Sequence, residues 1–198
     1  NDDYVEVKDS SSLDITGTIT VEAWVNVGEL GSKFHFIVSK HYVPTGYTLH
    51  IKPSNKFAFE INSQYQCAVE SPTIPELGKW YYVVGTYDQS QLKIYINGML
   101  GDTEEYTAEL ATNNQNLKIG EWSAGGYHFK GAIDEVRISS MATSGDWIKT
   151  CYNNQSSPFD FYSVGEEEQR TLNLNITKSD SPDPVDAGSE LTYTINYE

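Results

Sequence analysis

The stretch that decides the fold is GAIDEVRI, residues 131–138, which follows a loop rich in glycine and aromatic residues. It alternates as a β-strand does, with Val136 and Ile138 on the face opposite to Glu135. The alternation predicts that Val136 and Ile138 face a hydrophobic core. It also puts Asp134 at the end of this inward row, where a carboxylate is costly unless a metal ion, an arginine or backbone amides pair with it.

Runs with the same alternation recur along most of the chain, separated by turn residues at intervals typical of a sandwich. We therefore predict an all-β protein, an antiparallel two-sheet jelly-roll sandwich with roughly a dozen short strands. The strands expected before residue 131 cover residues 3–7, 18–27, 34–39, 47–51, 56–61, 80–87, 92–96 and 117–120.

Two local signals refine this prediction. Asn97-Gly98 indicates a hairpin with a type I′ turn, because both central positions of that turn need positive φ. One short helix is expected over residues 144–152, capped by Ser144 or Asp146 and ended by the asparagines at 153 and 154.

Composition and charge exclude some functions. The chain of 198 residues has 28 acidic and 13 basic residues and a formal net charge of −15. Nucleic acid is therefore excluded as a partner, because neutralising phosphates requires clustered Lys and Arg. No apolar run reaches the ~18 residues that a membrane-spanning helix needs, so no membrane span is expected.

The order of five motifs resembles that of laminin-G-like domains, which belong to the concanavalin A-like lectin and glucanase superfamily. The resemblance covers about residues 3–155 and implies a jelly-roll domain over residues 1–165 of an extracellular, multidomain surface protein. The motifs are TITVEAWV (18–25), KWYYVVGTY (79–87), LKIYING (92–98), LKIG (117–120) and GAIDEVRI (131–138).

The C-terminal part differs in composition. Residues 166–170 read as a charged linker. Residues 171–198 contain two alternating strands and resemble the start of an immunoglobulin-like surface repeat. So short a segment cannot close a sandwich. Either the repeat is cut there, or its strands add to the sheet of a neighbouring subunit by β-augmentation.

Catalysis is not expected. Glycoside hydrolases with this jelly roll carry an acid and a nucleophile as carboxylates two to four residues apart on a strand. No predicted strand carries such a pair, and Glu22 and Glu60 stand alone. Glu22 and Arg137 lie on outward rows, so we expect a cross-strand ion pair between them.

Calcium is the cofactor that the resemblance implies. Related jelly rolls often hold a structural calcium ion through the aspartate that corresponds to Asp134, together with backbone carbonyl oxygens. Such hard oxygen ligands suit calcium. The alternative is that Asp134 accepts hydrogen bonds from backbone amides or a basic side chain without a metal.

Two loops are candidates for ligand binding, residues 40–44 and 121–128, because related domains bind ligands where these loops meet. Exposed aromatic rings can stack on sugar faces, and amide or carboxylate groups can bond hydroxyls. The predicted ligand-binding residues are Tyr42, Glu121, Trp122, Tyr127 and His128.

Two functions remain open from the sequence. The leading hypothesis is a non-catalytic adhesion or carbohydrate-binding module at the cell surface, with a glycan or a surface protein as its ligand. The alternative is a structural subunit of a filament or surface layer, assembled through residues 171–198 with a neighbouring subunit.

Overall fold

The computed structural model describes residues 3–62, 68–161, 165, 176–181, 188–190 and 192–197. The chain divides into two compact units, Asn1–Tyr162 and Ser163–Glu198. The predicted linker at 166–170 lies outside the described residues. No helix among the residues described is long and apolar enough to cross a membrane.

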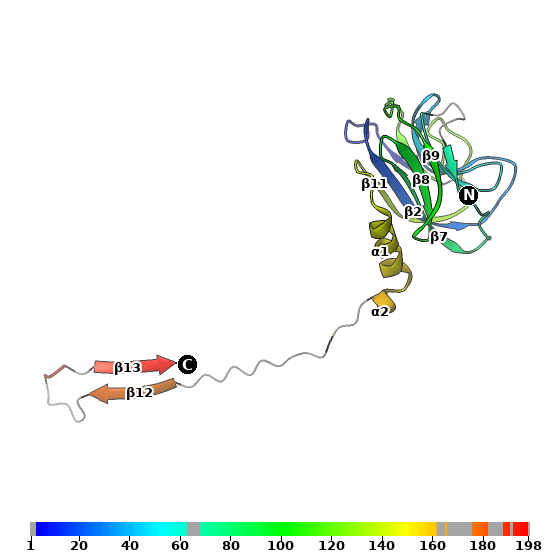
Figure 1. Ribbon diagram of the computed structural model, residues 1–198. Coiled ribbons are helices and arrows are strands. Elements are labelled where there is room, and N and C mark those ends of the chain that lie inside the picture. Colours follow the sequence, from blue (N-terminus) through cyan, green and yellow to red (C-terminus); the bar gives the residue numbers. More distant parts are fainter. Residues whose placement is uncertain are drawn as a thin grey trace. The chain divides into compact units, whose positions relative to one another are not determined.

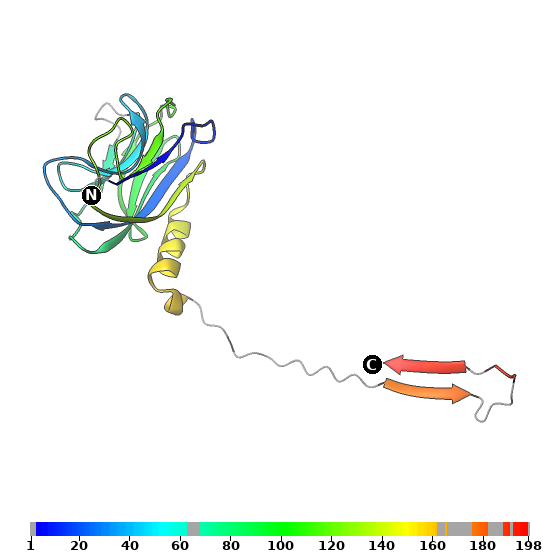
Figure 2. The same cartoon turned by 180° about the vertical axis from the view of Figure 1, so that it is seen from behind.

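The first unit is a sandwich of two antiparallel sheets (Figures 1 and 2). One sheet has six strands in the order β1-β10-β3-β4-β5-β6, and the other has five in the order β11-β2-β7-β8-β9. The six are β1 (Val5–Val7), β10 (Leu117–Ile119), β3 (His35–Tyr42), β4 (Thr45–Ile51), β5 (Phe57–Ile61) and β6 (Ala68–Glu70). The five are β11 (Gly131–Ser139), β2 (Ile19–Val27), β7 (Trp80–Tyr87), β8 (Gln91–Ile96) and β9 (Met99–Glu105).

The core lies between the two sheets and follows the alternation of the strands. In β2, Ile19, Val21 and Val25 are fully buried, whereas Trp24 on the other face is half-buried. In β4 the alternate residues Leu49 and Ile51 join the same core cluster. The prediction of an antiparallel two-sheet sandwich is confirmed.

The prediction that Asp134 faces inward is wrong. The register pairs Asp134 with Trp24 and Arg137 with Glu22, so two residues of β11 oppose one residue of β2 at a β-bulge. Glu135 within the bulge has a φ of 50°. The extra residue lets Ile133 face the core before the bulge and Val136 and Ile138 after it, and Asp134 stays exposed on the outer face. Strict alternation cannot reveal such an insertion.

The two local signals are confirmed, with one change. Asn97 and Gly98 have φ values of 51° and 76° and join β8 to β9. Ser144 caps helix α1 (Gly145–Ser156) by accepting a hydrogen bond from the amide of Trp147. The helix continues through 153 and 154, where an end was expected, and a short α2 (Pro158–Phe161) follows.

Helix α1 packs on the outer face of the five-stranded sheet. Its buried Ile148 joins a small cluster with Tyr82, Val84 and Tyr95 of β7 and β8. Beside this cluster, the expected ion pair between Glu22 and Arg137 forms, and the Tyr82 hydroxyl also donates to Glu22.

The second unit contains β12 (Ile176–Ser181) and β13 (Thr192–Tyr197), which pair antiparallel with each other. A two-stranded pair is marginally stable alone in water. Both the immunoglobulin-like repeat and assembly by strand addition to a neighbour stay predictions.

Replacing Gly85 with alanine should lower the free energy of unfolding by about 1–3 kcal/mol or more. A Cβ at Gly85 would lie 2.1 Å from Cγ of Phe59. Phe59 is fully buried in the opposite sheet and cannot move without disturbing the core.

Urea unfolding of Gly85→Ala beside Gly31→Ala checks this expectation. A Cβ at Gly31 would meet nothing within 4 Å, so that control should stay within about 0.5 kcal/mol of the parent protein. Equal stability of the two variants would contradict the packing described.

Candidate functional site

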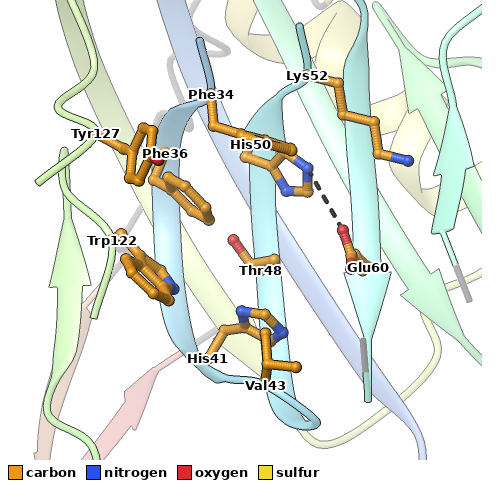
Figure 3. A pocket seen from close by; sticks show the side chains of 10 residues that line it. All are labelled: Phe34, Phe36, His41, Val43, Thr48, His50, Lys52, Glu60, Trp122 and Tyr127. Atoms are coloured by element: carbon orange, nitrogen blue, oxygen red, sulfur yellow. Dashed lines mark ion pairs between the residues drawn. The ribbon is translucent and has the colours of Figure 1, made fainter. Parts of the chain in front are cut away.

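A pocket of ≈ 210 Å³ lies on the outer face of the six-stranded sheet, over β3, β4 and β5 (Figure 3). Two kinds of side chain line it, aromatic rings on one side and polar groups on the other. They are Phe34, Phe36, His41, Val43, Thr48, His50, Lys52, Glu60, Trp122 and Tyr127.

The polar wall comes from the outward rows of β4 and β5. Tyr47, Leu49 and Ile51 are core residues, so the intervening Thr48 and His50 point away from the core. Thr48 pairs in register with Glu60 of β5. Figure 3 shows His50 and Glu60 facing each other, with 3.5 Å between Nε2 of His50 and Oε2 of Glu60.

The aromatic wall combines the start of β3 with a distant loop. Phe36 stacks on Trp122 with ring centroids 6.1 Å apart. Tyr127 meets Trp122 edge-on at 6.1 Å and Phe34 edge-on at 6.2 Å. Such offset and edge-to-face contacts fix the rings relative to one another, so this wall is formed before any ligand arrives.

The loop that carries Trp122 and Tyr127 is fixed to β3 at both of its ends. The Ser123 hydroxyl donates to the carbonyl of Ser39 at 2.6 Å and accepts from the amide of His41 at 3.0 Å. Further along, the amide of Phe36 donates to the carbonyl of Tyr127 at 3.3 Å. Residues far apart in the chain thereby build one wall.

Glu121 holds the loop from within. Its carboxylate is buried, pairs with Lys118, and accepts from the amide of Gly126 at 2.9 Å. Its Oε1 also lies 3.5 Å from Nε2 of His128. Burial alone would raise the pKa of Glu121, but the hydrogen bonds from Lys118 and Gly126 outweigh it and lower that pKa below its usual value. Glu121 is therefore ionised and closes the turn.

The histidines of the pocket are neutral. Burial lowers the pKa of His41 to about 4 and, together with the charge of Lys52, lowers the pKa of His50 to about 3. In the described part of the chain, neither ring nitrogen of His41 or of His50 has a hydrogen-bond partner, and Nε1 of Trp122 also lacks one. Buried polar atoms without partners are costly and uncommon. They mark the positions where a polar ligand would bond.

The structure brings some of the predicted site residues together. Trp122 and Tyr127 line the pocket, whereas Glu121 and His128 do not line it and instead contact each other within the loop. Tyr42 is 51% exposed and does not line the pocket.

Sequence reasoning missed the polar wall of His41, His50 and Glu60. A signal for it was present, because Thr48, His50 and Glu60 occupy the outward positions of two neighbouring strands. A row of polar residues on an outer face usually indicates solvent. Here His50 is 1% and Glu60 7% exposed, and the ring of His50 packs against Phe34 and Phe36.

Asp134 lies far from this pocket in the fold, on β11 of the other sheet, where it lines a wider groove with Trp24, Trp80 and Tyr152. Its Oδ1 accepts from the amide of Glu135 at 2.8 Å. The described residues contain no group of three or more His, Cys, Asp or Glu side chains that could hold a metal. The calcium ion expected at Asp134, with backbone carbonyl oxygens as its other ligands, stays a prediction.

A family model described as the concanavalin A-like lectin/glucanases superfamily, of the laminin G type, matches residues 1–149. The chain belongs to the concanavalin A-like superfamily. A search of curated proteins found no significant match. The superfamily includes lectins and glucanases, so membership defines the fold and leaves the activity to the site.

Several solved structures share this fold. One, from Bacteroides ovatus, is described as a candidate carbohydrate-binding protein; it has 22% identity and a TM-score of 0.62, over 74% of this chain and 43% of that one. The ligand-binding domain of botulinum neurotoxin serotype D, solved with N-acetylneuraminic acid, has 17% identity and a TM-score of 0.61 over 77% and 40%.

A third structure comes from work on cell entry of botulinum neurotoxin type C through two ganglioside molecules. It has 16% identity and a TM-score of 0.58 over 76% of this chain and 39% of that one. The present chain thus spans less than half the length of each of these three solved chains. At such identities the similarity shows the fold alone.

Proposed function

We propose that this domain is a non-catalytic glycan-binding module and that a sugar residue occupies the pocket over β3, β4 and β5. The observation that carries the proposal is the pairing of an aromatic wall with buried nitrogen atoms that lack partners, on His41, His50 and Trp122. A sugar has an apolar face of C–H groups and a rim of hydroxyls, and these two walls match both.

Each wall has a defined part in binding. The ring of Trp122, already oriented by Phe36 and Tyr127, offers a surface to the C–H face of a sugar. The neutral imidazoles each present one donor and one acceptor, and the carboxylate of Glu60 accepts from hydroxyls. Because these groups are held in place beforehand, little conformational entropy is lost on binding.

The pocket supports binding rather than hydrolysis. Glycoside hydrolases flank the scissile bond with two carboxyl groups about 5–9.5 Å apart. Of the residues that line the pocket in the described part of the chain, Glu60 contributes the sole carboxylate. Of the three solved structures named above, one is described as a candidate carbohydrate-binding protein, one holds N-acetylneuraminic acid, and one concerns cell entry that depends on gangliosides. These descriptions also support a binding role.

The resemblance to domains of surface proteins leads us to propose an extracellular location, where glycans are accessible. The acidic surface, with a net charge of −15, suits solubility there. Adhesion to a glycan-bearing surface is the role that such a module would have in a larger protein.

Trp122→Ala should weaken binding to a glycan by about tenfold or more, since loss of an aromatic contact costs on the order of 1.4 kcal/mol. A glycan array identifies a ligand for the full chain, and calorimetric titration of that ligand measures the change. The matched control is Trp147→Ala on α1, because Trp147 is 63% exposed and lies outside the pocket.

The control variant should bind as the parent protein does. Undiminished binding by Trp122→Ala, or the absence of any glycan ligand on the array, would contradict the proposed function.

A further inference from the structure

Building on the proposed function, we infer that the pocket binds the terminal residue of a glycan and selects a sugar without a carboxylate. Uronic and sialic acids are rejected. Two features of the pocket carry this inference, the side chains that bound it on three sides and the carboxylate of Glu60, which has no cationic side chain bonded to it in the described part of the chain.

The pocket closes on three sides. Val43, in the turn between β3 and β4, bounds one end along the strands, and Phe34 and Lys52 bound the other (Figure 3). The rings of Trp122 and Tyr127 bound the side next to β3. An internal residue of a polysaccharide needs an exit for the chain on two sides, whereas a terminal residue needs one.

The volume of the pocket leads to the same conclusion. At ≈ 210 Å³, it lies below the ~300–1,000 Å³ typical of pockets for drug-sized ligands. It therefore suits a single sugar ring rather than several.

Two side chains that can carry charge over a wide pH range line the pocket, Lys52 and Glu60, and Glu60 is 7% exposed. Every titratable group that lines the pocket near it is either neutral or already paired. His50, its nearest partner, and His41 are neutral because burial lowers the pKa of each imidazole. Lys52 pairs with Glu70, with 3.0 Å between Nζ and Oε1. Glu60 therefore contributes the sole carboxylate among the described residues that line the pocket, and the lining cation, Lys52, is engaged by Glu70.

An anion in a confined pocket distinguishes ligands by their charge. A hydroxyl can donate to the Glu60 carboxylate and form a strong, charge-assisted hydrogen bond. A ligand carboxylate would meet it as a like charge where little water remains to screen the repulsion. The expected ligand thus differs from N-acetylneuraminic acid, the acidic sugar present in the structure of the neurotoxin domain.

Matched pairs of methyl glycosides test the inference directly on the full chain. Methyl glucoside and methyl glucuronide differ only in a CH₂OH group or a carboxylate at C6, and methyl galactoside and methyl galacturonide form a second pair. We expect at least one neutral glycoside to bind and its acidic partner to bind about tenfold more weakly, measured by calorimetry or saturation-transfer NMR. On an array, glycans that carry the neutral sugar only at internal positions should give no signal.

Glu60→Gln should reduce the difference between the members of a pair to within about threefold, because the isosteric amide removes the charge. Glu76→Gln is the control for charge removal, since Glu76 is 67% exposed and paired with Lys79, and it should keep the full difference. If Glu60→Gln does not fold, the comparison within each pair on the parent protein still tests the inference.

Equal or tighter binding of the acidic partner, or a difference that Glu60→Gln leaves intact, would overturn the selectivity while the proposed function stands. Binding of internal sugar residues would overturn the end-on mode. Failure of every glycoside and every array glycan to bind would overturn the proposed function itself, and the inference with it.

Discussion

Replacing Lys40 with methionine is expected to lower the free energy of unfolding by about 2–3 kcal/mol, the upper range for hydrogen bonds to a charged group, since the two carboxylates it leaves behind are partly exposed. Lys40 is 2% exposed and pairs in register with the core residue Tyr47. Its Nζ lies 2.5 Å from Oδ1 of Asp9 and 3.3 Å from Oδ1 of Asp14. Methionine fills a similar volume but leaves both carboxylates without their cation.

The ammonium group of Lys40 also joins distant segments. It donates to the carbonyls of Asn113 at 2.9 Å and Gln115 at 3.0 Å. One side chain thereby ties β3 to the N-terminal segment and to the loop before β10. Its loss frees carbonyl groups as well as carboxylates, which adds to the cost.

Urea unfolding measures the effect, and Lys79→Met is the control. Lys79 is 60% exposed and pairs with the exposed Glu76, so its replacement should leave the free energy of unfolding close to that of the parent protein, because solvent screens such a pair. Similar small changes in both variants would show that the Lys40 network does not stabilise the fold.

Acidification should destabilise the domain well above the pH at which carboxylates titrate. His41 and His50 have pKa values of about 4 and about 3 in the folded protein, against about 6.5 in an unfolded chain. Between these limits the unfolded chain binds protons that the folded protein does not. The contribution of these two histidines to the free energy of unfolding is therefore fully present above pH 6.5 and is lost as the pH falls toward 4.

The slope for each histidine is small near pH 7 and approaches about 1.4 kcal/mol per pH unit below pH 6.5. Urea unfolding at pH 7, 6 and 5 measures it, and His50→Gln should lose about half of the slope. The difference between the parent and this variant removes the general effect of the protein's net charge. A free energy of unfolding that stays constant from pH 7 to 5 would contradict the burial of these histidines.

Alternation and turn chemistry predicted much of the fold. Asn97-Gly98 and Ser144 are local signals, and the structure uses both as expected. The bulge at Glu135 was not predictable, because alternation assumes an unbroken register. It moved Asp134 to the outer face.

The sequence predicted the aromatic wall of the candidate site but not its polar wall. Trp122 and Tyr127 stood out as aromatic residues in a glycine-rich loop, and both line the pocket. His50 and Glu60 did not stand out, since polar residues on an outward row normally meet water. His50 packs against Phe34 and Phe36, and the loop that carries the other rings of the wall is fixed to β3 by a hydrogen bond between Ser123 and Ser39, which are 84 positions apart.

A crystal structure of the full chain with a bound neutral glycoside tests the central claim most directly. We expect one sugar ring in the pocket, its C–H face against Trp122 and its hydroxyls within hydrogen-bonding distance of His50 and Glu60. A sugar bound elsewhere, for example in the groove beside Trp80 and Asp134, with the pocket over β3–β5 unchanged, would contradict the claim.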